Sequence, residues 1–158
     1  MAETELAGAA LEIAQKRETR GLNHTLGVHF ITVEPDCVEA VMPITEAILQ
    51  PFGLLHGGAT IALLESVASA GGELNCDLET EQPFGVEADI RHRNSGKLGG
   101  TVRGVARLRE TKPSSKVGYK LYWDVTAFDS EGGIISEGTF VVKVVPKAYL
   151  AEKEAGRA

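Results

Sequence analysis

The stretch 50–72, with the sequence QPFGLLHGGATIALLESVASAGG, is the feature that most constrains the fold. Proline and glycine break the chain before position 59, and residues 59–70 then run without either through mostly good helix formers. This pattern predicts a turn followed by a helix that starts near Gly57. The only ionisable side chain between positions 59 and 72 is Glu65, so we expect this mostly apolar helix to lie inside the fold.

The two sides of the predicted helix differ in character. Spacings of three, four and seven residues place small or slightly polar residues on the face of Glu65: Gly58, Ile61, Ala62, Ala68, Ser69 and Gly72. The opposite stripe fits packing against a sheet: Leu63, Val67, Ala70 and Leu74. A buried, ionised carboxylate costs several kcal/mol unless it is paired. Glu65 therefore indicates a functional role, and the alternative is a glutamate at a wet helix edge.

Length and composition favour a single domain and exclude several partners. The chain has 158 residues, of which 43% are hydrophobic, and this suits one domain with a sizeable core. The net charge is -6 without long runs of like charge, so we expect neither nucleic acid nor a membrane surface as a partner. No stretch resembles a membrane span or export signal, which predicts a cytoplasmic protein. Cys37 and Cys76 are interpreted as reduced packing residues.

The remaining chain predicts an α+β fold in which an antiparallel sheet wraps around one central buried helix. Apolar periodicity indicates an amphipathic helix at 3–18, a break at 21–24 and a charged tail that is either a loose helix or disordered. Alternating patterns predict strands at 26–34, 37–44, 84–92, 101–110, 119–127 and 134–145. We divide the chain into an N-terminal helix (1–22), a main domain (23–146) and a C-terminal tail (147–158).

The turn QPFGLLHGG leads into a helix with a glutamate nine residues after the histidine, and this arrangement resembles the hotdog-fold thioesterases over residues 24–145. It is most similar to small bacterial acyl-CoA thioesterases of the 1,4-dihydroxy-2-naphthoyl-CoA and hydroxybenzoyl type. The resemblance implies a hotdog fold for the main domain. It also implies a homodimer with one continuous sheet as the minimum catalytic unit, and dimers that pair into a homotetramer.

The resemblance also implies roles for particular residues. Glu65 corresponds to the catalytic carboxylate, Gln50 to the amide that binds the thioester, and His56 to the histidine of the motif. Ser69 corresponds to the residue that positions the attacking water, and His92 to a strand histidine near the bound substrate.

The chemistry of thioester hydrolysis adds a donor to this set. Negative charge develops on the carbonyl oxygen, and a helix N-terminus presents free N–H groups to stabilise it, so the Gly57 N–H is the candidate. Gly57 and Glu65 are eight residues apart, about 12 Å along a helix, and one thioester cannot touch both. We therefore expect Gly57, His56 and Gln50 of one chain to face Glu65 and Ser69 of another. Glu65 either attacks the carbonyl or deprotonates water.

Each assignment has a structural alternative. Gly57 is also what a tight turn requires, and Gln50 is also compatible with a solvated loop. His56 either orients the substrate or caps its own turn. Ser69 is also a common packing residue, and His92 either lines the acyl pocket or is a core histidine.

Acyl-CoA is the expected partner, and its phosphates require cations. Basic side chains available for this purpose are Arg91, Arg93, Arg107, Arg109 and Lys116. Of these we select Arg93, and we place Gly58 with it in the substrate and CoA contacts. The four histidines are scattered without carboxylate or thiol partners at ligand spacing, so we expect no metal and no cofactor.

Together these observations predict a thioesterase that hydrolyses an aromatic or medium-sized acyl-CoA to the free acid and CoA. Three alternatives stay open: a thioesterase for acyl groups held by a carrier protein, a hotdog hydratase, and a hotdog protein that binds acyl-CoA without turning it over. The presence of Glu65 argues against pure binding, because binding alone does not require a lone acid in an apolar helix.

Overall fold

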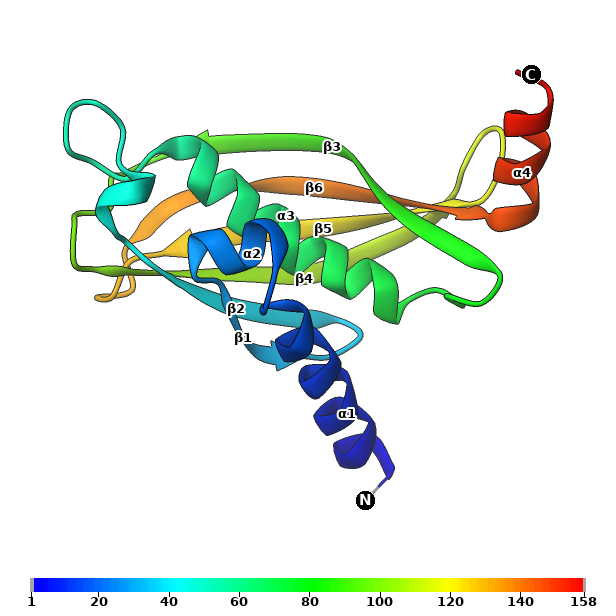
Figure 1. Ribbon diagram of the computed structural model, residues 1–158, viewed down its shortest axis with the longest axis horizontal. Coiled ribbons are helices and arrows are strands. Elements are labelled where there is room, and N and C mark those ends of the chain that lie inside the picture. Colours follow the sequence, from blue (N-terminus) through cyan, green and yellow to red (C-terminus); the bar gives the residue numbers. More distant parts are fainter. Residues whose placement is uncertain (1, 158) are drawn as a thin grey trace.

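The computed structural model describes residues 2–157, and it consists of one antiparallel sheet with a long helix on one face (Figure 1). The sheet has six strands in the order β1-β2-β4-β5-β6-β3. The strands are β1 (His29–Val33), β2 (Cys37–Pro43), β3 (Glu81–His92), β4 (Thr101–Pro113), β5 (Tyr119–Phe128) and β6 (Ile134–Pro146). The helices are α1 (Ala2–Arg17), α2 (Gly21–Leu26), α3 (Gly57–Leu74) and α4 (Lys147–Ala155), with a short 3-10 helix at Glu46–Ile48. The predicted α+β fold around a central helix is confirmed.

Helix α3 packs on the sheet through its apolar side and its glycines. Leu63 and Val67 of the predicted stripe are fully buried, whereas Ala70 and Leu74 are only partly buried. Near its C-terminal end the helix lies so close to β5 that a Cβ added at Gly71 would be 2.3 Å from the Trp123 ring. The absence of a side chain at this position therefore determines how closely helix and sheet approach.

Most element boundaries agree with the sequence, and α2 is the main correction. Helix α3 starts at Gly57 as predicted, and the tail forms the helix α4 up to residue 155. The break after the N-terminal helix was predicted at 21–24, but it lies at residues 18–20, and residues 21–24 belong to α2. That helix is closed by Gly27, which adopts the left-handed conformation (φ 68°) and donates its N–H to the carbonyls of Asn23 and His24.

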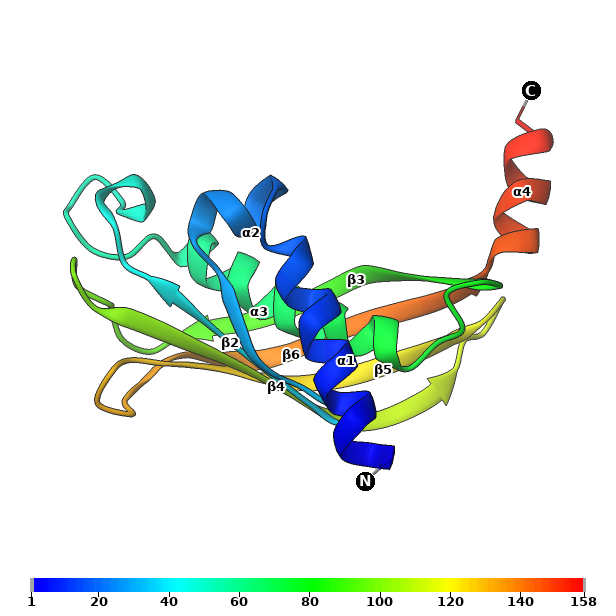
Figure 2. The ribbon, with the colours of Figure 1, turned by 60° about the horizontal axis from the view of Figure 1, so that its bottom comes forward.

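The two edges of the sheet differ in what covers them. At the β1 edge, α1 supplies side chains to the strand: Gln15 Nε2 donates to the Phe30 carbonyl at 3.0 Å, and Glu18 Oε1 accepts from the Phe30 N–H at 2.6 Å. Helix α1 contacts β1, and Figure 2 shows it beside this edge of the sheet. The β3 edge has no covering element among residues 2–157, and its apolar Phe84 and Val86 are 38% and 44% exposed. Bare edge strands favour pairing with another chain.

Other expectations can be compared with residues 2–157. No helix there is long and apolar enough to cross a membrane. Cys37 and Cys76 are free and partly buried, and burial raises the pKa of both thiols. The domain boundaries at 22/23 and 146/147 stay predictions, and the outermost residues of the two flanking segments, Met1 and Ala158, lie outside the described residues.

Candidate active site

The start of α3 presents one free backbone donor. His56 is the N-cap, and its Nδ1 accepts a hydrogen bond from the Gly58 N–H at 2.9 Å. The His56 carbonyl accepts from the Ala59 N–H at 3.0 Å. Within residues 2–157, the Gly57 N–H has no hydrogen-bond acceptor, so it is the donor that the first turn leaves available at the positive end of the helix dipole.

His56 therefore caps its own turn, which was one of its two predicted roles. Because Nδ1 accepts the Gly58 N–H, this hydrogen bond assigns the proton of the neutral ring to Nε2. The imidazole is exposed, so the Nε2–H can still donate to a molecule bound at the helix start.

His92 lies against the same turn although it comes from the end of β3. Its Nδ1 is 2.8 Å from Ser136 Oγ on β6, and Ser136 is fully buried. A Cβ added at Gly57 would be 2.7 Å from His92 Nε2, so only glycine lets the ring approach the helix start. The residue is exposed, and the alternative of a core histidine is wrong. Ser136 was not predicted, because its role depends on strand pairing that no local motif announces.

Gln50 lies in the turn before α3 and is partly buried. Its Oε1 accepts from the Phe52 N–H at 2.6 Å, and its backbone N–H donates to the Leu54 carbonyl at 2.8 Å. No acceptor for the side-chain amide N–H groups occurs within the part of the chain that the structure describes. The carbonyl oxygen thus stabilises the turn, and the amide nitrogen remains available for a ligand.

Glu65 differs from the prediction in one respect, because its side chain is exposed in the single chain rather than buried. The carboxylate lies beside β3, which is an edge strand of the sheet. Its Oε1 would be 3.1 Å from a Cβ added at Gly85 of β3, so this glycine leaves room for the carboxylate. The signal in the sequence was a lone glycine in an alternating strand, and β3 does have an irregular register between residues 85 and 87.

Glu65 and Ser69 share a cavity of about 420 Å³. Its floor is the outer face of α3, and its roof and walls come from α1, α2 and β1. The lining is mostly apolar and includes Ala10, Ile13 and Ala62. The sequence predicted α1 as an amphipathic surface helix, and nothing in its own pattern indicated that it would border the carboxylate.

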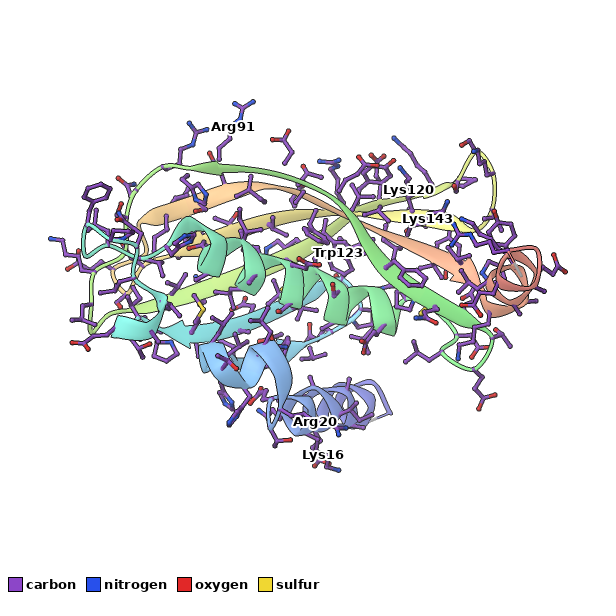
Figure 3. All side chains as sticks on the ribbon, turned by 45° about the horizontal axis from the view of Figure 1, so that its top comes forward. Lys16, Arg20, Arg91, Lys120, Trp123 and Lys143 are labelled. Atoms are coloured by element: carbon purple, nitrogen blue, oxygen red, sulfur yellow. The ribbon has the colours of Figure 1, made fainter. Side chains whose placement is uncertain are left out.

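The residues expected near CoA have mixed surroundings. Gly58 is exposed at the helix start. Arg93 forms an ion pair with Glu137 at 2.9 Å, and both side chains are at least one-third exposed, so the guanidinium remains reachable. Figure 3 shows Arg91 projecting outward from β3. Among residues 2–157, no group of three or more metal-binding side chains is present.

The candidate residues thus form two groups rather than one. Gln50, His56, Gly57 and His92 gather at the start of α3, while Glu65 lies more than two turns further along the same helix. Eight residues of helix correspond to about 12 Å. One thioester bound in a single chain cannot contact both Gly57 and Glu65.

A central helix embraced by an antiparallel sheet, with an HGG turn at the helix start, defines the hotdog class of folds. Residues 52–136, more than half of the chain, match the family model described as the thioesterase superfamily. The chain belongs to this superfamily, and the prediction of an acyl-CoA thioesterase is confirmed at this general level.

Named relatives and solved structures agree with this assignment. The chain is 36% identical over 107 residues to 1,4-dihydroxy-2-naphthoyl-CoA hydrolase of Escherichia coli, covering 68% of this chain and 74% of the relative. It is 33% identical over 110 residues to the proofreading thioesterase EntH of Klebsiella pneumoniae, covering 68% and 73%. The structure superimposes on a mutant of thioesterase PA1618 from Pseudomonas aeruginosa with a TM-score of 0.77 and 27% identity, covering 86% and 94%.

Proposed function

We propose that the protein hydrolyses an aromatic or medium-sized acyl-CoA, with the Gly57 N–H and the Gln50 amide polarising the carbonyl and Glu65 driving the attack. The observation that carries this proposal is the Gly57 N–H, which has no acceptor among residues 2–157 and lies at a helix N-terminus beside the His92 ring. A donor aimed at developing negative charge contributes about 2.7–4 kcal/mol to catalysis. The name of the Escherichia coli relative, a hydrolase of an aromatic CoA ester, supports the acyl class.

Glu65 has two chemically complete routes. As a general base it takes a proton from water while the water oxygen bonds to the carbonyl carbon. The carbon–sulfur bond then breaks, and the CoA thiolate takes up the proton. As a nucleophile its oxygen bonds to the carbonyl carbon and expels CoA thiolate, and water then hydrolyses the resulting anhydride. Single-turnover hydrolysis in ¹⁸O-labelled water distinguishes them, because only the covalent route transfers label into Glu65.

The proposed site is completed by a second chain. Gly57 and Glu65 are too far apart for one thioester, so the donors of one chain must meet the carboxylate of another. The β1 edge is occupied by α1, which leaves the bare β3 edge for pairing. Glu65 lies at that edge beside Gly85, where an incoming chain would also arrive. The pairing of two such dimers into a tetramer stays a prediction.

The first experiment measures CoA thiol release with a thiol reagent from a panel of aryl and straight-chain acyl-CoA esters. We expect Glu65→Ala to lower kcat/KM at least about 100-fold, a loss of about 2.7 kcal/mol of transition-state stabilisation. The matched control is Glu152→Ala, which removes an exposed glutamate from α4. Release that persists in Glu65→Ala would refute the role of this residue. Binding of acyl-CoA without any release by the wild type would favour a ligand-binding protein, and activity on carrier-protein thioesters alone would favour that alternative.

Mixed dimers test the two-chain site directly. We combine Glu65→Ala chains with Gln50→Ala chains, each inactive alone. In a symmetric dimer, each heterodimer has one intact site and one doubly defective site. Random mixing makes about half of the dimers heterodimers, which predicts roughly a quarter of the wild-type activity. If all catalytic groups act within one chain, every site in the mixture lacks one of them, and no activity returns.

A further inference from the structure

The two N-terminal helices are fixed over the carboxylate side of α3. Gln15 and Glu18 bind the backbone of Phe30 at the β1 edge. Farther along, Asn23 Oδ1 of α2 accepts a hydrogen bond from Ser66 Oγ at 2.7 Å, and Ser66 is the residue directly after Glu65. The segment is therefore tied both to the sheet and to the helix that carries the carboxylate.

The cavity beneath this segment has the composition of a pocket for an apolar group. Small side chains form both of its surfaces, namely Ala62 and Ala70 on α3 and Ala10 and Ala14 on α1. Ile13, which also lines the cavity, is 53% exposed, so part of the lining is a large apolar side chain in contact with water. The polar groups that converge on it include Glu65 and Ser69.

We infer that α1 and α2 form the roof of the acyl-binding pocket, and that its occupant is the apolar acyl group of the thioester whose carbonyl is attacked with the help of Glu65. This inference rests on the proposed function. A cavity of about 150 Å³ lined by apolar side chains binds benzene. The 420 Å³ available here accommodate a bicyclic aromatic or a medium-length straight acyl group. The N-terminal segment, which lies outside the matched residues 52–136, thereby determines acyl size.

Two substitutions on α1 change the roof without touching Glu65. Ala10→Leu fills the cavity, and Ile13→Ala enlarges it at a half-exposed position where the fold loses little packing. The matched control is Ala151→Leu, the same change on an exposed face of α4 far from the cavity (Figure 1). Circular dichroism and denaturation establish that each variant is folded.

Binding is measured first, with CoA and with a non-hydrolysable thioether analogue of decanoyl-CoA. One methylene in an apolar pocket changes discrimination about 10–200-fold, so we expect Ala10→Leu to raise the Kd of the analogue at least about tenfold and to leave that of CoA within about twofold. Ala151→Leu leaves both unchanged. An unchanged Kd of the analogue in Ala10→Leu would overturn the inference, whether or not the protein hydrolyses esters.

Hydrolysis of butanoyl-, decanoyl- and naphthoyl-CoA then separates this inference from the proposed function. We expect Ala10→Leu to lose rate on the two larger esters and keep it on butanoyl-CoA, while Ile13→Ala shifts the preference toward the larger esters. Equal losses of rate on all esters, or a change in oligomeric mass, would indicate that this face of α1 contacts another chain. Either result would refute the inference that α1 and α2 cover the acyl pocket. A wild type that binds the analogue selectively but releases no thiol would refute only the proposed function.

Discussion

The packing of α3 on the sheet can be tested by giving Gly71 a side chain. A Cβ at this position would lie 2.3, 2.5 and 2.9 Å from three carbons of the Trp123 ring. Ordinary carbon contacts begin near 3.4 Å, so the ring or the helix has to move by about 1 Å. Trp123 is fully buried on the central strand β5, so a movement of its ring displaces other core side chains.

The expected loss of stability combines two opposing effects. Alanine gains about 0.8–1.0 kcal/mol over glycine in a helix interior. Overpacking a core costs about 1–3 kcal/mol and occasionally more. We therefore expect Gly71→Ala to lower the free energy of unfolding by up to about 2 kcal/mol, which corresponds to a fall in Tm of up to about 8 °C for a chain of this length.

The assay is urea unfolding followed by tryptophan fluorescence and circular dichroism. The matched control is Gly8→Ala in α1, where an added Cβ meets nothing within 4 Å, so this variant should gain stability. A double variant with Trp123→Phe removes the outer ring that causes the clash and should recover part of the loss relative to Trp123→Phe alone; both are followed by circular dichroism, because Trp123 is the single tryptophan of the chain. If Gly71→Ala is as stable as Gly8→Ala, the contact with Trp123 does not determine how the helix is seated.

Three further predictions concern the site and its surroundings. Ser136→Ala should lower kcat/KM about tenfold by releasing the His92 ring, and the loss should be non-additive with His92→Ala; additive losses would contradict the coupling. Gly57→Ala should lower kcat more than stability, because its methyl group displaces His92 and covers the N–H, and unchanged thiol release would contradict this. Burial, together with the hydrogen bond to Glu81, raises the pKa of Tyr119 to about 12. The neutral phenol therefore contributes fully to the stability of the fold below the usual tyrosine pKa of about 10, and this contribution is lost as the pH rises toward 12. Denaturation at pH 8 and 11 should therefore show a larger loss in the wild type than in Tyr119→Phe, and equal losses would contradict this assignment.

The sequence predicted α3 well because its limits are marked by local chemistry. The prolines and glycines before position 57 prevent an earlier start, and the apolar run after it has no competing strand pattern. The end of β4 was less predictable: the strand was expected at 101–110, because a proline such as Pro113 usually stops a strand, whereas β4 extends to Pro113. Residues of β4 beyond Arg107 have no partner on β2, so the missing N–H of Pro113 leaves no hydrogen bond unmade and the strand continues.

The surroundings of Glu65 depend on tertiary contacts that a helical pattern does not contain. The apolar composition of α3 predicted burial, but the pattern does not specify how much of each face its neighbours cover. The position of α1 follows from side-chain bonds to Phe30 across more than ten residues of sequence, and neither Gln15 nor Glu18 belongs to a recognisable motif. The histidine cap of α3 was foreseeable, whereas the contact between Gly57 and His92 required the pairing of β3 with β6.

The exposure of Glu65 and the bare β3 edge have a common explanation under the proposed function. A carboxylate buried within a single folded chain would lower its stability by several kcal/mol unless it were paired. An exposed carboxylate at an open edge avoids that cost until a second chain arrives and brings its own helix start with the Gly57 N–H. Pairing at β3 would then cover Phe84 and Val86, and this apolar burial offsets the desolvation of the acid. Folding of the single chain therefore does not desolvate the Glu65 carboxylate. Its desolvation occurs only on dimerisation, when the Gly57 N–H of the second chain is also present.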